Sequence, residues 1–182
     1  LAQSLVRNSS LLTIFLHGNN FRDDGAKKLA AMLSLNRTLE ALYIDQCGLT
    51  GDGFSHVMVG LKSGQHLQRL SVRDLDLSEE ESDIACVTLA DCLPHMRLKE
   101  LSFSAEYTPR GRGAYAHDLL QAEVLKGFEH NTSLDSIQFY DEWFIRFDKK
   151  PYLEYLVLRN GVLPFLNDTA FLNNDQEPET TP

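Results

Sequence analysis

Two arginines, Arg110 and Arg112, lie in a glycine- and proline-containing segment of a chain that is otherwise acidic. Each guanidinium offers a planar fork of N–H donors, so the pair could bind a carboxylate or another anion. The segment follows a predicted strand, at the end from which binding groups can project. We therefore treat both arginines as candidate partner-binding residues, and a solvated loop is the alternative interpretation.

Other residue types that could support catalysis do not occur in catalytic patterns. The sequence has no GxxxxGK[ST] phosphate loop, no GxSxG nucleophile motif, no GxGxxG motif and no HExxH zinc motif. The three cysteines, Cys47, Cys86 and Cys92, form no CxxC pair. We expect free, buried thiols in a reducing compartment, and no catalytic residue, metal or cofactor.

The net charge and the hydropathy of the chain argue against some classes of binding partner. The 182 residues include 17 basic and 26 acidic side chains, and the formal net charge is −9. This balance argues against nucleic-acid binding, which needs cations to neutralise phosphates. No apolar run approaches the roughly 20 residues that cross a bilayer, and the first ten residues do not resemble a signal peptide. We expect a soluble protein that binds neither nucleic acid nor membrane.

An apolar Leu-x-x-Leu-x-Leu pattern, with Ile, Val or Phe at some positions, recurs along the chain. It starts at Leu11 and returns at Leu39 and Leu67 with one constant interval, and then at Leu98 and Leu134 after longer intervals. Within each block the apolar period changes from two to about 3.6, which predicts a short strand followed by a helix. Such units bury their apolar faces only against their neighbours. The sequence therefore predicts a solenoid with a parallel inner sheet and outer helices.

Capping residues and apolar spacing predict helices in the later part of the chain. Ser78 precedes three glutamates, which is typical of an N-cap with acidic residues in the first turn. The apolar stripe of this helix is expected at Ile84, Val87, Leu89, Ala90 and Leu93. A later helix is expected over residues 119–128.

Four N-x-Ser/Thr sequons could indicate glycosylation. Three of them, at Asn8, Asn36 and Asn131, lie three residues before a leucine that opens a repeat, and the fourth is at Asn167. The repeat explains this recurrence. We therefore expect these asparagines to form the turns between helix and strand.

The first unit, residues 11–38, resembles a leucine-rich repeat of the ribonuclease-inhibitor type, whose units are about 28 residues long. Asn19 occupies the asparagine position of that repeat and Cys47 follows in the second unit, whereas later units depart from it with Leu75, Glu106 and Glu142. The resemblance implies an α/β leucine-rich-repeat solenoid, or horseshoe, that binds another protein. It also implies a cytoplasmic location.

The repeat register divides the chain into four parts. Residues 1–10 are expected to be the partial helix of a preceding repeat, so that the chain would be a fragment of a longer array. Residues 11–142 hold five repeats with insertions in the fourth and fifth. Residues 143–172 form a C-terminal cap, in which residues 152–166 fit a helix or a sixth strand, and the helix is preferred. Residues 173–182 are an expected disordered acidic tail.

Side chains between the strand leucines should face the concave surface, because strand residues alternate between the two faces. Two columns result, the first of Phe15, Tyr43, Ser71, Ser102 and Gln138, and the second of His17, Asp45, Arg73, Ser104 and Tyr140. We predict that Phe15 lies beside Tyr43, and Asp45 beside Arg73. An ordinary solvated face with cross-strand pairs is the alternative, but two adjacent aromatic residues there favour a partner site.

The expected function is a monomeric, non-catalytic scaffold that binds another protein on the concave face and the adjoining rim. The candidate contacts are Phe15, His17, Tyr43, Asp45, Arg73, Tyr140, Arg110 and Arg112. One alternative is a GTPase-activating protein resembling the Ran GTPase activator, in which Arg110 or Arg112 would act. The other is the sensor repeats of a nucleotide-binding, leucine-rich-repeat receptor.

Overall fold

A computed structural model describes residues 1–106 and 123–139. The elements, in chain order, are α1 (Ala2–Val6), β1 (Thr13–Phe15), α2 (Arg22–Leu35), β2 (Ala41–Tyr43), α3 (Gly51–Ser63), β3 (Arg69–Asp76), α4 (Glu79–Cys92), the 3₁₀ helix η1 (Leu93–His95), β4 (Glu100–Glu106) and β5 (Ser136–Phe139). Residues 123–130 are also helical, which agrees with the later part of the helix expected over 119–128. The predicted cap and tail lie outside the described residues.

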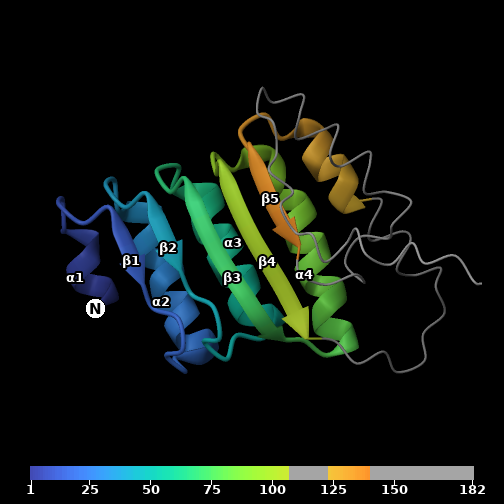
Figure 1. Cartoon of the computed structure of the whole chain (residues 1–182), viewed down its shortest axis with the longest axis horizontal. Helices are drawn as coiled ribbons and strands as arrows, with labels where there is room; N and C mark the ends of the chain where they lie inside the picture. Colours follow the sequence, from blue (N-terminus) through green and yellow to red (C-terminus); the bar gives the residue numbers. More distant parts are fainter. Residues whose placement is uncertain (107–122, 140–182) are drawn as a thin grey trace, which may run out of the picture.

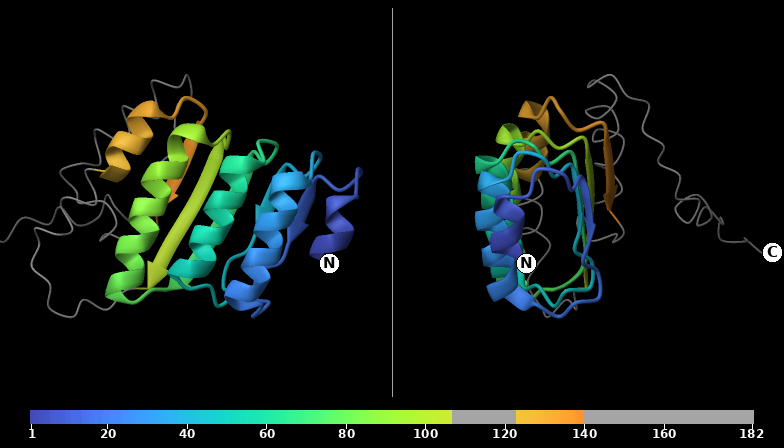
Figure 2. Two further views of the ribbon diagram at one scale, coloured as in Figure 1. Left: turned by 180° about the vertical axis from the view of Figure 1, so that it is seen from behind. Right: turned by 90° about the vertical axis from the view of Figure 1, so that its left-hand side faces the viewer.

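The five strands form one parallel sheet in the order β1-β2-β3-β4-β5. The helices lie in a second layer on one face of this sheet (Figures 1 and 2). Phe15 pairs with Tyr43, Tyr43 with Ser71, Ser71 with Ser102 and Ser102 with Gln138. This register confirms the predicted repeat alignment and the leucine-rich-repeat solenoid.

The core lies between the sheet and the helices. The strand side chains Leu42, Leu70 and Leu101 are at most 2 % exposed. On the helix side, Met58 and Leu89 are fully buried. Burial of one such side chain stabilises a fold by roughly 1.5–3 kcal/mol, so stacking of the repeats supplies the main driving force.

The apolar stripe predicted for α4 is partly wrong. Ile84 and Val87 are more than half exposed, while Ala85, Cys86 and Leu89 are buried. The buried positions each lie one repeat beyond a buried residue of α3, because the two helices pack on the sheet in the same orientation. The buried face of α4 is therefore identified by the repeat register and not by the apolar pattern of α4 alone.

The predicted asparagine turns are confirmed. Asn36 Oδ1 accepts hydrogen bonds from the backbone N–H groups of Thr38 and Leu39 at 2.9 and 2.7 Å, and its Nδ2 donates to the Leu5 carbonyl of the preceding repeat at 2.6 Å. Asn131 makes the same bonds late in the chain, including one from Nδ2 to the Leu93 carbonyl at 2.6 Å. Each buried asparagine therefore shapes its own turn and ties it to the repeat before.

The predicted cap of α4 is also confirmed. Ser78 Oγ accepts from the Glu81 N–H, and Glu81 Oε2 accepts from the Ser78 N–H at 2.8 Å, which forms a capping box. Hydrogen bonding of the Ser78 side chain and backbone to the Glu81 carboxylate lowers the pKa of Glu81.

Candidate functional site

Three aromatic side chains gather on the face of the sheet that points away from the helices. The Phe15 and Tyr43 rings, on β1 and β2, are stacked with centroids 4.6 Å apart and planes 10° apart. His17 meets Phe15 edge-on at 6.2 Å. We call Phe15, His17 and Tyr43 the aromatic shelf. Phe15 is 62 % exposed, so the shelf presents apolar ring surface to solvent.

The aromatic shelf is positioned by the parallel pairing of β1 with β2. The two strands bring Phe15 and Tyr43 directly opposite each other, as predicted. A stacked aromatic pair contributes about 0.5–1.5 kcal/mol beyond the area it buries. The pairing also fixes the backbone beneath both rings, so the fold itself positions the stacked pair.

An ion pair lies beside the shelf. Arg73 Nη2 donates to Asp45 Oδ2 at 2.9 Å, and the Arg73 backbone N–H donates to Asp45 Oδ1 at 2.9 Å. Ser71 Oγ also donates to Asp45 Oδ1, at 2.6 Å. The predicted neighbours Asp45 and Arg73 are therefore in contact, and the carboxylate is fully engaged within the sheet.

Asp45 is buried beside Arg73 rather than open to solvent. Asp45 is only 7 % exposed, although its position in the repeat predicted that it would lie on the open concave surface. Burial alone would raise its pKa, but the hydrogen bonds from Arg73 and Ser71 and the charge of Arg73 outweigh burial and hold the pKa below its ordinary value. Asp45 is thus ionised at neutral pH and orients Arg73, whose side chain is 40 % exposed.

Ser71 is a supporting residue that sequence reasoning did not select. It was placed in the first column, yet its role as a donor to Asp45 was not expected. The feature of the sequence that could have indicated this role is the position of Ser71 on β3, diagonally opposite Asp45 in the sheet register. A similar bond links Asp74 and Ser104 in the next repeat, where Ser104 Oγ donates to Asp74 Oδ1 at 3.3 Å.

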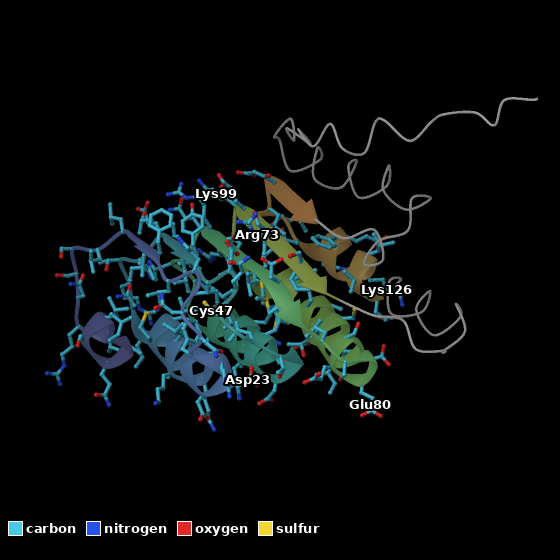
Figure 3. The ribbon with its side chains drawn as sticks, turned by 60° about the horizontal axis from the view of Figure 1, so that its bottom comes forward. Asp23, Cys47, Arg73, Glu80, Lys99 and Lys126 are labelled. Carbon is cyan, nitrogen blue, oxygen red and sulfur yellow. The ribbon has the colours of Figure 1, made fainter. Side chains whose placement is uncertain are left out.

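The structure describes five of the eight predicted contact residues, on neighbouring strands and turns of the sheet. Phe15 is in ring contact with His17 and Tyr43, and Asp45 forms an ion pair with Arg73. Figure 3 labels Arg73 on the strand side of the molecule. Tyr140, Arg110 and Arg112 lie outside the described residues.

The cysteines are free and buried, as predicted. Burial raises the pKa of Cys86 to about 12 and that of Cys92 to about 11. Burial likewise raises the pKa of Cys47, whose thiol donates to the Leu16 carbonyl at 3.2 Å. All three are therefore protonated thiols at neutral pH, a state that is a poor nucleophile.

Within residues 1–106 and 123–139, no group of three or more His, Cys, Asp or Glu side chains could hold a metal ion. In the same part of the chain, no helix is long and apolar enough to cross a membrane.

Similar sequences occur among curated proteins, although no family model matches. Leucine-rich repeat-containing protein 45 of Gallus gallus is 34 % identical over 76 residues, which are 41 % of this chain and 11 % of that protein. The protein named NACHT, LRR and PYD domains-containing protein 14 of Mus musculus is 33 % identical over 113 residues, 61 % of this chain and 11 % of the relative. The chain thus spans about a tenth of the length of these relatives.

Solved structures share the fold. The leiomodin-1 actin-binding site 2 structure has a TM-score of 0.67 at 12 % identity and covers 88 % of this chain and 87 % of its own. The tropomodulin C-terminal domain of Caenorhabditis elegans has a TM-score of 0.63 at 11 % identity and covers 88 % and 93 %. The chain is therefore similar in sequence to leucine-rich-repeat proteins and has a leucine-rich-repeat fold, while the ribonuclease-inhibitor type stays a prediction.

Proposed function

We propose that this chain is a non-catalytic protein-interaction scaffold that binds a protein partner at the aromatic shelf and Arg73. The exposed Phe15 ring carries the proposal. At 62 % exposure on a regular strand, most of this large apolar side chain is left uncovered by the fold. Aromatic residues and arginine are the side chains that most often dominate binding energy at protein interfaces.

Each residue has a distinct part in the proposed site. The rings of Phe15 and Tyr43 supply apolar area that a partner can cover. Arg73, fixed by Asp45, supplies directed N–H donors at the edge of that area. A polar group beside an aromatic anchor gives orientation as well as affinity. Arg110, Arg112 and Tyr140 remain proposed contacts from the sequence alone.

The comparisons support a protein as the partner class. One solved structure with the same fold is described as an actin-binding site of leiomodin-1. At 12 % identity this likeness concerns the fold, so we do not transfer actin to this chain. What supports the proposal is that a solenoid of similar size binds a protein.

Affinity capture followed by titration tests the proposal. Wild type and a Tyr43→Ala, Arg73→Ala double variant are used as bait, and the affinity of each recovered partner is then measured with purified proteins. Loss of an aromatic and an arginine anchor is expected to weaken binding by about tenfold or more, since about 1.4 kcal/mol corresponds to a factor of ten. Leu35→Ala is the control, because Leu35 is an exposed apolar residue on α2, in the helix layer and away from the proposed site. Identical partners and affinities for wild type and the double variant would refute the proposed site.

A further inference from the structure

A second exposed apolar surface lies on the helix layer, across the molecule from the aromatic shelf. Val59 of α3 and Ile84 and Val87 of α4 are 54, 53 and 54 % exposed. Val59 and Val87 are one repeat apart and occupy equivalent positions of neighbouring helices, which Figure 2 shows side by side in the view from behind. We call these three residues the aliphatic patch.

The two helices beneath the patch are firmly tied together. The hydroxyls of Ser55 and Thr88 are 3.1 Å apart, four residues from Val59 and Ile84 respectively. Lys62 Nζ donates to Asp91 Oδ2 at 2.7 Å on the other side of the two valines. The patch is thus framed by two contacts that join α3 to α4. A surface fixed in this way loses little conformational entropy when it binds.

Glycine brings α3 and α4 into close contact at their N-terminal ends. A β-carbon at Gly51 would lie 2.6 Å from the Glu81 carbonyl oxygen, closer than two such atoms can approach. This contact joins the first turns, just as Lys62 and Asp91 join the last. The two helices therefore meet at both ends of the seam between them.

Negative charge is concentrated around the patch. α3 and α4 together carry six carboxylates and one lysine, a formal charge of −5 out of −9 for the whole chain. In contrast, α2 carries three basic and two acidic residues. Glu80 is exposed one turn before Ile84, and Figure 3 shows it at the outer end of α4, pointing away from the fold. Asp52 is exposed at the equivalent position of α3.

We propose that the aliphatic patch is a second interaction surface, and that its occupant is a basic amphipathic helix of a partner protein. The apolar face of such a helix would cover Val59, Ile84 and Val87. Its lysines or arginines would reach Glu80 and Asp52, which lie two turns, about 10 Å, before the valines along their helices. The proposal concerns a different face from the aromatic shelf and does not depend on it.

The charge distribution favours this occupant over others. Two copies of the chain that met through α3 and α4 would bring −5 against −5 at a symmetric interface. An anionic lipid surface or a nucleic acid would be repelled in the same way. A strand would find no open backbone edge, because helical N–H and C=O groups are bonded within the helix. A helix can pack its side-chain ridges along the seam between α3 and α4.

A synthetic peptide provides the test. The probe is a labelled peptide of about 18 residues made of leucine and lysine, with leucines spaced three and four apart, and binding is followed by fluorescence anisotropy. Its affinity for an Ile84→Ser, Val87→Ser variant is expected to be about tenfold lower than for wild type, and Val59→Ser alone should show a smaller loss. Substitutions at half-exposed sites leave stability nearly unchanged, which thermal unfolding verifies.

Matched controls separate the patch from general attraction between a cation and an acidic protein. An Ala31→Ser, Leu35→Ser variant changes exposed apolar residues of α2 and should bind the probe like wild type, as should the Tyr43→Ala, Arg73→Ala variant of the shelf. Glu80→Lys should weaken binding about threefold. A peptide with glutamate in place of lysine should not bind.

Three results would overturn the proposal. The first is an equal affinity of the probe for wild type and the Ile84→Ser, Val87→Ser variant, or no binding to either. The second is equal binding of the lysine and glutamate peptides. The third is concentration-dependent self-association in sedimentation velocity that the Ile84→Ser, Val87→Ser variant abolishes, because a second copy would then be the occupant.

Discussion

The strands of the first two repeats are short, and those of the next two are long. β1 and β2 have three residues each, whereas β3 has eight and β4 has seven. The strands start level with one another, since Thr13, Ala41, Arg69 and Glu100 are successive partners in the sheet. The two regions therefore differ in how their strands end.

The short strands end where a side chain binds the backbone. Asn19 Nδ2 donates to the Leu16 carbonyl at 2.9 Å within the first repeat. The Cys47 thiol donates to the same carbonyl from the second repeat, at 3.2 Å. Side-chain bonds of this kind compete with the sheet ladder for backbone groups. Both bonds lie in the turns that connect β1 and β2 to the helices that follow them.

The third repeat has Leu75 at that position, which has no polar side-chain group. Its side chain is buried, and its backbone continues in the sheet opposite Ala105 after a bulge that follows Val72. The long strand thus coincides with a buried leucine at the position where the first two repeats have Asn19 and Cys47. The aromatic shelf belongs to the short-strand region, and the bond between Asp45 and Arg73 joins the two regions.

Truncation of Leu75 should have the largest effect, because it removes the residue that distinguishes the long-strand region. Leu75→Ala should lower the free energy of unfolding by about 2–5 kcal/mol, as expected for a cavity at a fully buried leucine. Denaturant unfolding measures this. Backbone amides beyond the bulge, such as that of Asp76, should also exchange faster with solvent.

Val87→Ala is the matched control for Leu75→Ala. Val87 is more than half exposed, so the expected change is within about 0.5 kcal/mol. A loss below about 1 kcal/mol for Leu75→Ala would contradict the view that burial of this leucine holds the extended strand in place.

Periodicity made much of this comparison predictable. The constant repeat interval fixed which strand residues lie opposite each other, so the stacking of Phe15 on Tyr43 and the contact of Asp45 with Arg73 followed directly. Leu75, which replaces the asparagine of the repeat, also indicated where the turn after the strand would change. These features depend on the spacing of residues along the chain. This spacing is known from the sequence, without knowledge of side-chain conformations.

Burial was harder to predict than pairing. The sequence placed Asp45 on an open face, but Ser71 and Arg73 close over it, and this depends on the rotamers of three side chains. The exposure of Ile84 and Val87 was missed because a helical stripe of apolar residues defines a face only to within a turn. Packing of α4 against α3 decided which side of the stripe faced inward.

Removal of the Asp45 charge should weaken the connection between the two regions. Asp45→Asn is expected to cost about 1–3 kcal/mol at pH 7, because it breaks a buried bond to a charged partner. The folded pKa of Asp45 is lowered, so its stabilisation is present above its ordinary value of 3.8 and disappears as the pH falls through the lower folded pKa. The difference between wild type and variant in unfolding free energy should therefore shrink below about pH 4.

Asp52→Asn is the control for this pH dependence. Asp52 is exposed at the start of α3, and its replacement should change stability by less than about 0.5 kcal/mol. A stability difference between Asp45→Asn and wild type that stays constant from pH 7 to pH 3 would show that the charge of Asp45 is not what joins the repeats.

The smallest effect is expected at the one turn position that both regions share. Gly18, Gln46 and Asp74 are spaced at the constant repeat interval and have left-handed backbones, with φ of 72°, 55° and 58°. Gly18 and Gln46 follow β1 and β2, whereas Asp74 lies within β3. Only glycine adopts this conformation without steric cost, so Gln46→Gly should raise the unfolding free energy by about 0.5 kcal/mol, the relief exceeding the added freedom of the unfolded chain. Gln68→Gly, at a position without a positive φ, should instead lower it by about 0.5–1 kcal/mol. Chemical denaturation of the two variants checks the opposite signs. If both glycines destabilised the fold, the left-handed turn would carry no strain at Gln46.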